Sequence, residues 1–165
     1  LNNIQTVQEF LPALRKAIQE NITIELKYQP FNEKTSTLII HPYKIIEHNN
    51  RWSIVGLLEH VKGKNTIFNR LERIGKLNNF SFDRIIEDSI KLHSNIDFIK
   101  SNVKIDKILD NSIGPSVGDW EDALKRKIEI ILQISDKLSP YFLTKPLHNF
   151  QKVDKTKRIF SYQLI

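Results

Sequence analysis

The stretch IIHPYKIIEHNNRWSIVG, residues 39–56, decides the fold. Both of its halves are rich in Ile, Val, Tyr and Trp, which are residues typical of strands. His48-Asn49-Asn50 between them has the composition of a tight turn, so the stretch predicts two strands joined by a hairpin. Pro42 cannot donate a hydrogen bond to a strand ladder, so we expect the first strand to be broken or at a sheet edge there. Gly56 is expected to mark a bend or bulge.

The flanking residues supply a helix and further strands. Phe10 to Glu20 has apolar residues at helical spacing and predicts a helix with Pro12 in its first turn, after a connector over residues 1–9. Strands are expected over 22–28, 37–46, 51–60 and 66–74, with a hairpin turn at Lys62–Asn65 and a last short strand within 76–82. One helix and about five short strands predict a small, strongly bent β-barrel.

The second half of the chain has a different pattern. Residues 89–112 predict one or two short helices, and Gly114, Pro115 and Gly118 mark a loop. A strand, short helix, strand and strand follow, over 127–134, 135–144, 147–153 and 158–165. This β-α-β-β run is part of a ferredoxin-like unit. The sequence predicts an α+β protein with a barrel over 1–90, a helical linker over 91–120 and a partial ferredoxin-like extension over 121–165.

Composition limits the classes of function. Lys and Arg number 25 against 19 Asp and Glu, a net charge of +6, so an anionic partner is an open alternative to an ordinary mildly basic surface. The chain has no Cys, which excludes disulfides and thiolate zinc sites. It also lacks Met, which predicts a fragment or the loss of modified methionines from the sequence. With no membrane-length apolar run and no signal-peptide pattern, a cytoplasmic protein is expected.

The sequence carries no pattern of a catalytic or metal site. A Gly-rich phosphate loop and a Gly-x-Ser-x-Gly motif are both absent. The five histidines are scattered without metal-ligand spacing. Asp83 and the pair Glu87-Asp88 are interpreted as surface carboxylates. We therefore expect a binding protein and not an enzyme, with no cofactor and no metal.

Aromatic and basic residues gather on the predicted sheet. Bases stack on aromatic rings and phosphates pair with Arg, so such a mixture suits a single-stranded nucleic acid or a nucleotide. The alternative is that the aromatic residues belong to the core and the arginines are solvated. The candidate ligand-binding residues are Tyr28, Tyr43, Arg51, Trp52, Arg70 and Arg73, with His41 nearby.

These residues also carry a resemblance to the WYL-domain family of bacterial transcription regulators. The motifs are His41-Pro42-Tyr43, then Asn50 to Gly56, then Leu71-Glu72-Arg73-Ile74. Asp110 to Gly114 and Tyr141 to Gln151 are similar to the extension that follows WYL domains. The match covers most of the chain in the right order.

The resemblance implies an Sm-like barrel, a ferredoxin-like extension that makes dimer contacts, and a DNA-binding winged helix-turn-helix domain upstream. It implies the effector-sensing and dimerisation region of a transcription regulator, with a nucleic-acid or nucleotide-like anionic ligand. The alternative is a structural dimerisation scaffold with a degenerate ligand site. In both cases the expected assembly is a homodimer without membrane contact.

The sequence departs from the family pattern at three places. Ser53 and Ile54 stand where the family has Tyr and Leu, and Ser53 cannot stack on a base. Glu72 replaces Asp. The run from Asn69 to Leu71 is one residue short, and a one-residue slip reverses the facing of every later side chain in a strand. We therefore expect a chain break or a modified residue near Arg70.

Overall fold

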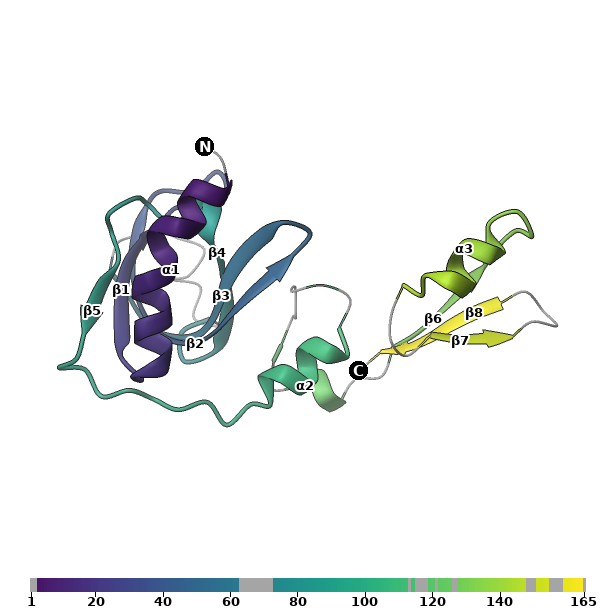
Figure 1. Ribbon diagram of the computed structural model, residues 1–165. Coiled ribbons are helices and arrows are strands. Elements are labelled where there is room, and N and C mark those ends of the chain that lie inside the picture. Colours follow the sequence, from purple (N-terminus) through teal and green to yellow (C-terminus); the bar gives the residue numbers. More distant parts are fainter. Residues whose placement is uncertain are drawn as a thin grey trace. The chain divides into compact units, whose positions relative to one another are not determined.

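The computed structural model describes residues 3–62, 73–112, 114, 119–120, 122–125, 128–147, 151–154 and 159–164. The chain divides into two compact units, Leu1–Asn102 and Val103–Ile165. The first unit is a helix followed by an antiparallel sheet, and the second has short helices and strands (Figure 1). The predicted α+β class is therefore confirmed. In the described part of the chain, no helix has the length and apolar character that crossing a membrane requires.

The first unit has one α-helix and a five-stranded sheet in the order β4-β3-β2-β1-β5. Neighbouring strands are antiparallel throughout. A short 3-10 helix, η2, follows β4. The elements are α1 (Asn3–Gln19), β1 (Thr23–Tyr28), β2 (Ser36–His48), β3 (Arg51–Lys62), β4 (Leu77–Ser81), η2 (Phe82–Arg84) and β5 (Lys91–His93).

The hairpin at the centre of the deciding stretch is confirmed. His48 faces Arg51 across a two-residue loop. The loop residues Asn49 and Asn50 have φ values of 50° and 62°. Positive φ at both loop residues matches the twist of the flanking strands, and Asn accepts this backbone at low cost.

Pro42 lies inside the continuous central strand β2, so it neither breaks the strand nor lies at a sheet edge. The register of β2 against β3 shifts between Pro42 and Lys44, and Pro42 faces Gly56. A Cβ atom on Gly56 would lie 2.7 Å from Ile40 Cγ2 and 2.8 Å from the His41 carbonyl oxygen. Gly56 therefore permits a close approach of the two strands at the irregularity.

The sheet is not closed into a barrel, and the prediction of a barrel is wrong. The edge strands β4 and β5 do not pair with one another in the described structure. Ile85, just after η2, makes a single isolated bridge with Tyr28 of β1. Closure stops there because η2 takes the chain out of strand geometry, and because β5 pairs with the free edge of β1 at Thr23–Glu25.

The predicted strand over 66–74 lies mostly outside the described residues, as does the expected break near Arg70. Arg73 and Ile74 are described, and they belong to a turn before β4.

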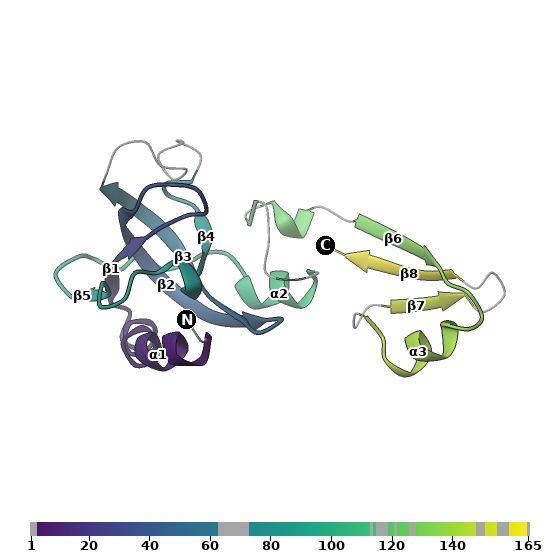
Figure 2. The ribbon, with the colours of Figure 1, turned by 90° about the horizontal axis from the view of Figure 1, so that it is seen from above.

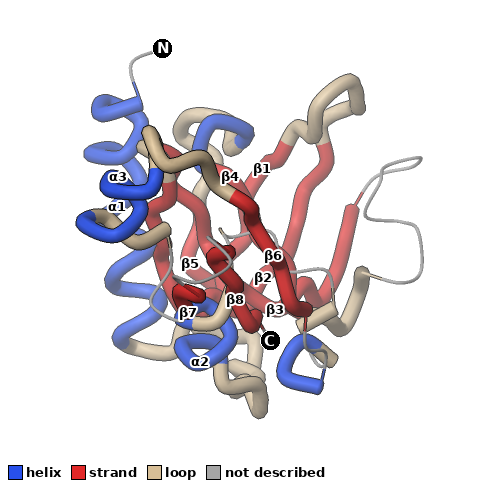
Figure 3. The backbone as a smooth tube through the Cα atoms, turned by 90° about the vertical axis from the view of Figure 1, so that its right-hand side faces the viewer, coloured by secondary structure: helices blue, strands red, loops and turns tan. Residues whose placement is uncertain are grey.

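Helix α1 begins earlier than predicted, at Asn3, and Pro12 lies inside it. Pro12 and Gln8, four residues before it, are both exposed, so the carbonyl group without a helical donor can be hydrated. The opposite face of α1 packs against the sheet through Phe10, Leu14 and Ala17 (Figure 3). The core also contains Ile24, Leu26, Tyr28, Leu38, Ile40, Ile54, Leu58, Val61, Phe80, Phe82 and Ile85.

The second unit contains the predicted strand, helix, strand and strand. Its sheet has the order β6-β8-β7, so the last strand lies between the other two (Figure 2). The helix is shorter than the predicted 135–144, and Pro140 lies in its first turn. Before them, residues 89–112 form a strand and one helix instead of helices alone. The elements are α2 (Ile105–Asp110), η3 (Ala123–Lys125), β6 (Ile128–Gln133), α3 (Ser139–Thr144), β7 (Gln151–Asp154) and β8 (Ile159–Leu164).

Candidate anion-binding cleft

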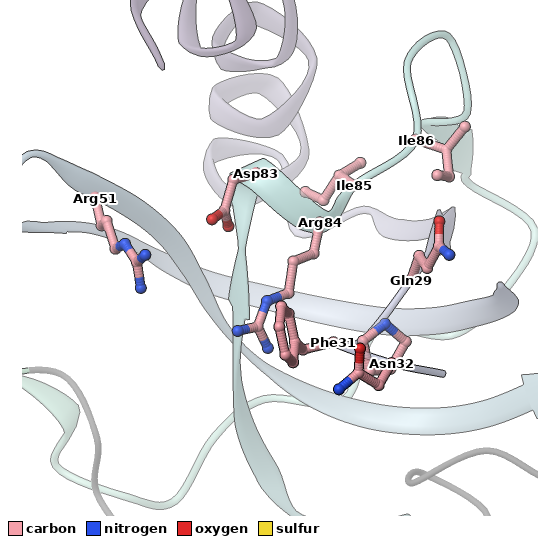
Figure 4. Close-up of a pocket in the computed structure, with 9 residues that line it drawn as sticks. Gln29, Phe31, Asn32, Arg51, Asp83, Arg84, Ile85 and Ile86 are labelled. Atoms are coloured by element: carbon pink, nitrogen blue, oxygen red, sulfur yellow. The ribbon is translucent and has the colours of Figure 1, made fainter. Parts of the chain in front are cut away.

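A cleft of about 430 Å³ opens on the first unit where the end of β1, the start of β3 and η2 meet. We call it the arginine cleft (Figure 4). Its walls include Gln29, Phe31, Asn32, Arg51, Asp83 and Arg84.

Backbone hydrogen bonds fix the two sides of the arginine cleft. Gln29 N donates to the Arg84 carbonyl oxygen at 2.9 Å, and Ile86 N donates to the Lys27 carbonyl oxygen at 2.9 Å. These bonds join the end of β1 to the segment around η2, although the two are more than fifty residues apart in sequence. Asn32, with φ of 60°, turns the loop after β1 back beside them.

The charges of the arginine cleft suit an anion. Arg51 is exposed and Arg84 is half-buried. Within the part of the chain that the structure describes, neither guanidinium has a carboxylate at ion-pair distance. Asp83 also lines the cleft, so its charged side chains are two cations and one anion. A guanidinium group binds phosphate or carboxylate through paired N–H donors, so each arginine offers a site for an anionic group.

The arginine cleft also offers an aromatic surface. The Phe31 side chain is 78% exposed, an unusual state for a large apolar group. In Figure 4 the Phe31 ring and the Arg84 side chain extend toward the same part of the cleft. A ring beside a guanidinium group can stack on a planar ligand while the cation binds its charged end.

Of the six predicted residues that the structure describes, Arg51 is the one that lines this cleft. Tyr28 instead belongs to the core of the first unit, and Trp52 is half-buried against that core. Tyr28 is 3% exposed, and its hydroxyl oxygen accepts a hydrogen bond from Ser81 N at 3.1 Å. Burial raises the pKa of Tyr28, against the opposing effects of this bond and of the nearby Arg84. The Trp52 ring packs against Phe82 at a centroid distance of 6.4 Å.

His41 and Tyr43 contact another part of their own unit, the segment after β5. The Tyr43 hydroxyl donates to the Ile99 carbonyl oxygen at 2.7 Å, and Ile99 N donates to His41 Nδ1 at 3.3 Å. The Phe98 ring packs edge-on against both side chains, at 5.4 Å from His41 and 5.7 Å from Tyr43. Burial raises the pKa of Tyr43 to about 12. These two residues are therefore away from the arginine cleft.

Arg73 is exposed in the turn before β4, and its carbonyl oxygen accepts a hydrogen bond from Asn78 Nδ2 at 3.1 Å. Arg70 lies outside the described residues.

Sequence reasoning missed Arg84 and Phe31. Position in the sequence was the only signal for either residue. Arg84 follows the last predicted strand in the run Phe82-Asp83-Arg84, and Phe31 lies in the predicted turn after Tyr28. No group of His, Cys, Asp and Glu among the described residues could hold a metal ion.

Comparison with known proteins identifies the class of the first unit. Residues 9–87 match the family model of the WYL domain, so this part of the chain is a WYL domain. One similar solved structure is Proteasome accessory factor B/C (PafBC) of Arthrobacter aurescens, with 12% sequence identity and a TM-score of 0.41. The match covers 97% of this chain and 21% of that chain, so this chain spans about a fifth of its length. No curated protein matches the sequence.

Proposed function

We propose that this chain is the effector-sensing region of a transcription regulator, and that the arginine cleft binds its effector. The effector is a nucleotide-like anion or a short single-stranded nucleic acid. The observation that carries the proposal is that Arg51, Arg84 and the exposed ring of Phe31 all line one cleft. A WYL domain over residues 9–87 supports the regulatory role.

The regulator as a whole is proposed to act in the cytoplasm as a homodimer that reads DNA through a winged helix-turn-helix domain elsewhere in the protein. The second unit is proposed to be a partial ferredoxin-like extension that makes dimer contacts. Effector binding would then shift the population of dimer arrangements and so the spacing of the DNA-reading helices. We expect no turnover of the bound ligand.

The test is binding of a fluorescein-labelled, twelve-nucleotide single-stranded DNA to the whole chain, followed by fluorescence polarisation at several salt concentrations. Log affinity should fall with log salt by about 0.7 for each phosphate that the protein neutralises. Arg51→Ala and Arg84→Ala should each weaken binding by roughly tenfold or more, because each removes a charged hydrogen-bonding group.

Arg15→Ala is the matched control, because Arg15 is an exposed arginine on α1, outside the arginine cleft. A loss of affinity that is equal in all three variants would mean that net charge, and not the cleft, attracts the DNA. Competition by a mononucleotide would show that the cleft takes a single nucleotide unit.

The second candidate function is a dimerisation scaffold with a degenerate ligand site. Ser53, at the position of the family's Tyr, is buried with 6% exposure and offers no ring. Tyr28, Trp52, His41 and Tyr43 all serve contacts within the first unit. A folded dimer that binds neither the DNA nor a mononucleotide would favour this function.

A further inference from the structure

Near the end of the first unit, Phe98 and Ile99 are held against β2 by two side chains of that strand, His41 and Tyr43. We call Phe98 and Ile99 the latch. His41 accepts a hydrogen bond from the latch, Tyr43 donates one to it, and the Phe98 ring contacts the rings of both. Neither the latch nor its neighbours from 97 to 100 belong to a helix or strand. The latch therefore depends on these contacts for its position.

The hydrogen bonds define the protonation state of His41. Ile99 N can only donate, so Nδ1 of His41 must be an unprotonated acceptor. The Thr23 hydroxyl lies 3.1 Å from the same nitrogen and, with Nδ1 unprotonated, can only share its single lone pair as a second donor. The ring hydrogen is then on Nε2, which lies 3.0 Å from Glu59 Oε2. The latch is thus made by the neutral form of His41 with its proton on Nε2.

We propose that protonation of His41 releases the latch. Phe98 and Ile99 are then bound to β2 at neutral pH and released from it in acid. Imidazolium carries a hydrogen on both nitrogens, so Nδ1 would present a donor to the donor of Ile99. Thr23 can reverse its hydroxyl to accept, but a backbone N–H cannot. The bond to the latch is the one that must be lost.

The groups around His41 set how readily it is protonated. Its ring is fully buried, and burial lowers its pKa from the ordinary value. Glu59 on β3 opposes this effect by attraction to the charged form. Tyr43 on β2 stays neutral. On the other side, Thr23 of β1 faces His93 of β5, whose Nε2 lies 4.0 Å from Glu25. Glu59 is therefore the charged group that acts directly on His41.

The direction of the pH effect follows from the lowered pKa. The released state, with a solvated ring, takes up a proton near pH 6.5, whereas the latched state takes it up only at lower pH. In the interval between them the released state binds more protons, so latching weakens as the pH falls. The latch is fully stable above about pH 6.5 and loses stability progressively below it.

The experiment measures hydrogen exchange of the Ile99 amide in the whole chain by NMR at pH 7.5 and pH 5.5, as protection relative to the intrinsic exchange rate at each pH. Protection should fall by roughly tenfold in acid. The His41 ring signals should titrate over the same pH range, and its Nδ1 should show the shift of an unprotonated acceptor at pH 7.5.

Three variants separate the contributions. His41→Asn keeps an acceptor near the position of Nδ1 but cannot be protonated, so protection should become independent of pH. Tyr43→Phe removes the second bond to the latch and should lower protection at both pH values while the pH step remains. His60→Asn, at an exposed histidine of β3, is the matched control and should behave as the unaltered chain.

Unchanged protection of Ile99 between the two pH values would overturn the proposal, and so would an equal fall in His41→Asn. If His41→Asn does not fold, Tyr43→Phe and the His41 titration still decide the matter, because loss of Ile99 protection must coincide with protonation of that ring. The result does not depend on whether the arginine cleft binds a ligand, since neither latch residue lines it.

Discussion

Gly56→Ala should destabilise the first unit, because the structure leaves no room for a methyl group at this position. The added methyl group would lie 2.7 Å from Ile40 Cγ2, 2.8 Å from the His41 carbonyl oxygen and 3.3 Å from Pro42 Cα. Two of these three atoms are backbone atoms of the central strand, so the clash cannot be relieved by a side-chain rotation alone. Overpacking of this kind costs about 1–3 kcal/mol, and we expect about 3 kcal/mol here.

Gly75→Ala is the matched control, because Gly75 has φ of 76° and no atom within 4 Å of the added Cβ. Its cost comes from left-handed backbone alone, about 1–2 kcal/mol. Urea unfolding can be followed by Trp52 fluorescence in a Trp120→Phe background, which leaves one tryptophan, in the first unit. At a slope of about 2 kcal/mol/M, Gly56→Ala should lower the midpoint by about 1.5 M. If Gly56→Ala costs no more than Gly75→Ala, the close approach of β2 and β3 is not as described.

Three further predictions concern other contacts. Tyr28→Phe should cost about 1 kcal/mol in urea unfolding, because the partly buried N–H of Ser81 loses its acceptor while the ring remains in the core. Lys62→Met should raise the pKa of Glu25 in an NMR titration, since the bond from Lys62 is the largest influence lowering it, and should change stability by under about 1 kcal/mol because the lysine is exposed. Ile108→Ala, at a side chain that is 1% exposed in the second unit, should cost about 2–5 kcal/mol there and leave DNA binding unchanged, as hydrogen exchange and polarisation would show.

Local signals in the sequence were sufficient for much of the fold. The hairpin at Asn49-Asn50 was predictable because two asparagines between strands favour the left-handed backbone that the loop needs. The β-α-β-β run of the second unit was predictable from strand-like segments on both sides of 135–144, although the helix there is shorter, Ser139–Thr144, with Pro140 in its first turn. The WYL motifs placed these elements in order, and the match over residues 9–87 confirms that family.

Closure of the sheet depended on competition between distant segments, which local patterns do not contain. Residues 91–93 read as part of a helical region, yet they pair with Thr23–Glu25 and take the edge of β1 that a barrel would use. The start of α1 was misjudged for a related reason. Pro12 is tolerated because it faces water, and which face of a helix is exposed follows from tertiary packing.

The candidate site was the hardest part to predict. Arg51 lines the arginine cleft, whereas Tyr28 is buried in the core and Trp52 is half-buried against it. Arg84 and Phe31 come together through backbone bonds between segments more than fifty residues apart, which sequence spacing cannot reveal. The seven predicted residues as a ligand set remain a prediction, and so do the domain bounds.

The open sheet has a consequence for self-association. A strand edge with free N–H and C=O groups invites pairing with another chain, and this is a common route to aggregation. At β5 the exposed edge is three residues long and starts with Lys91. An incoming strand would gain few bonds there and would meet a positive charge. A short, charged border of this kind lets the protein leave its sheet open at β5 without offering a template for fibre growth.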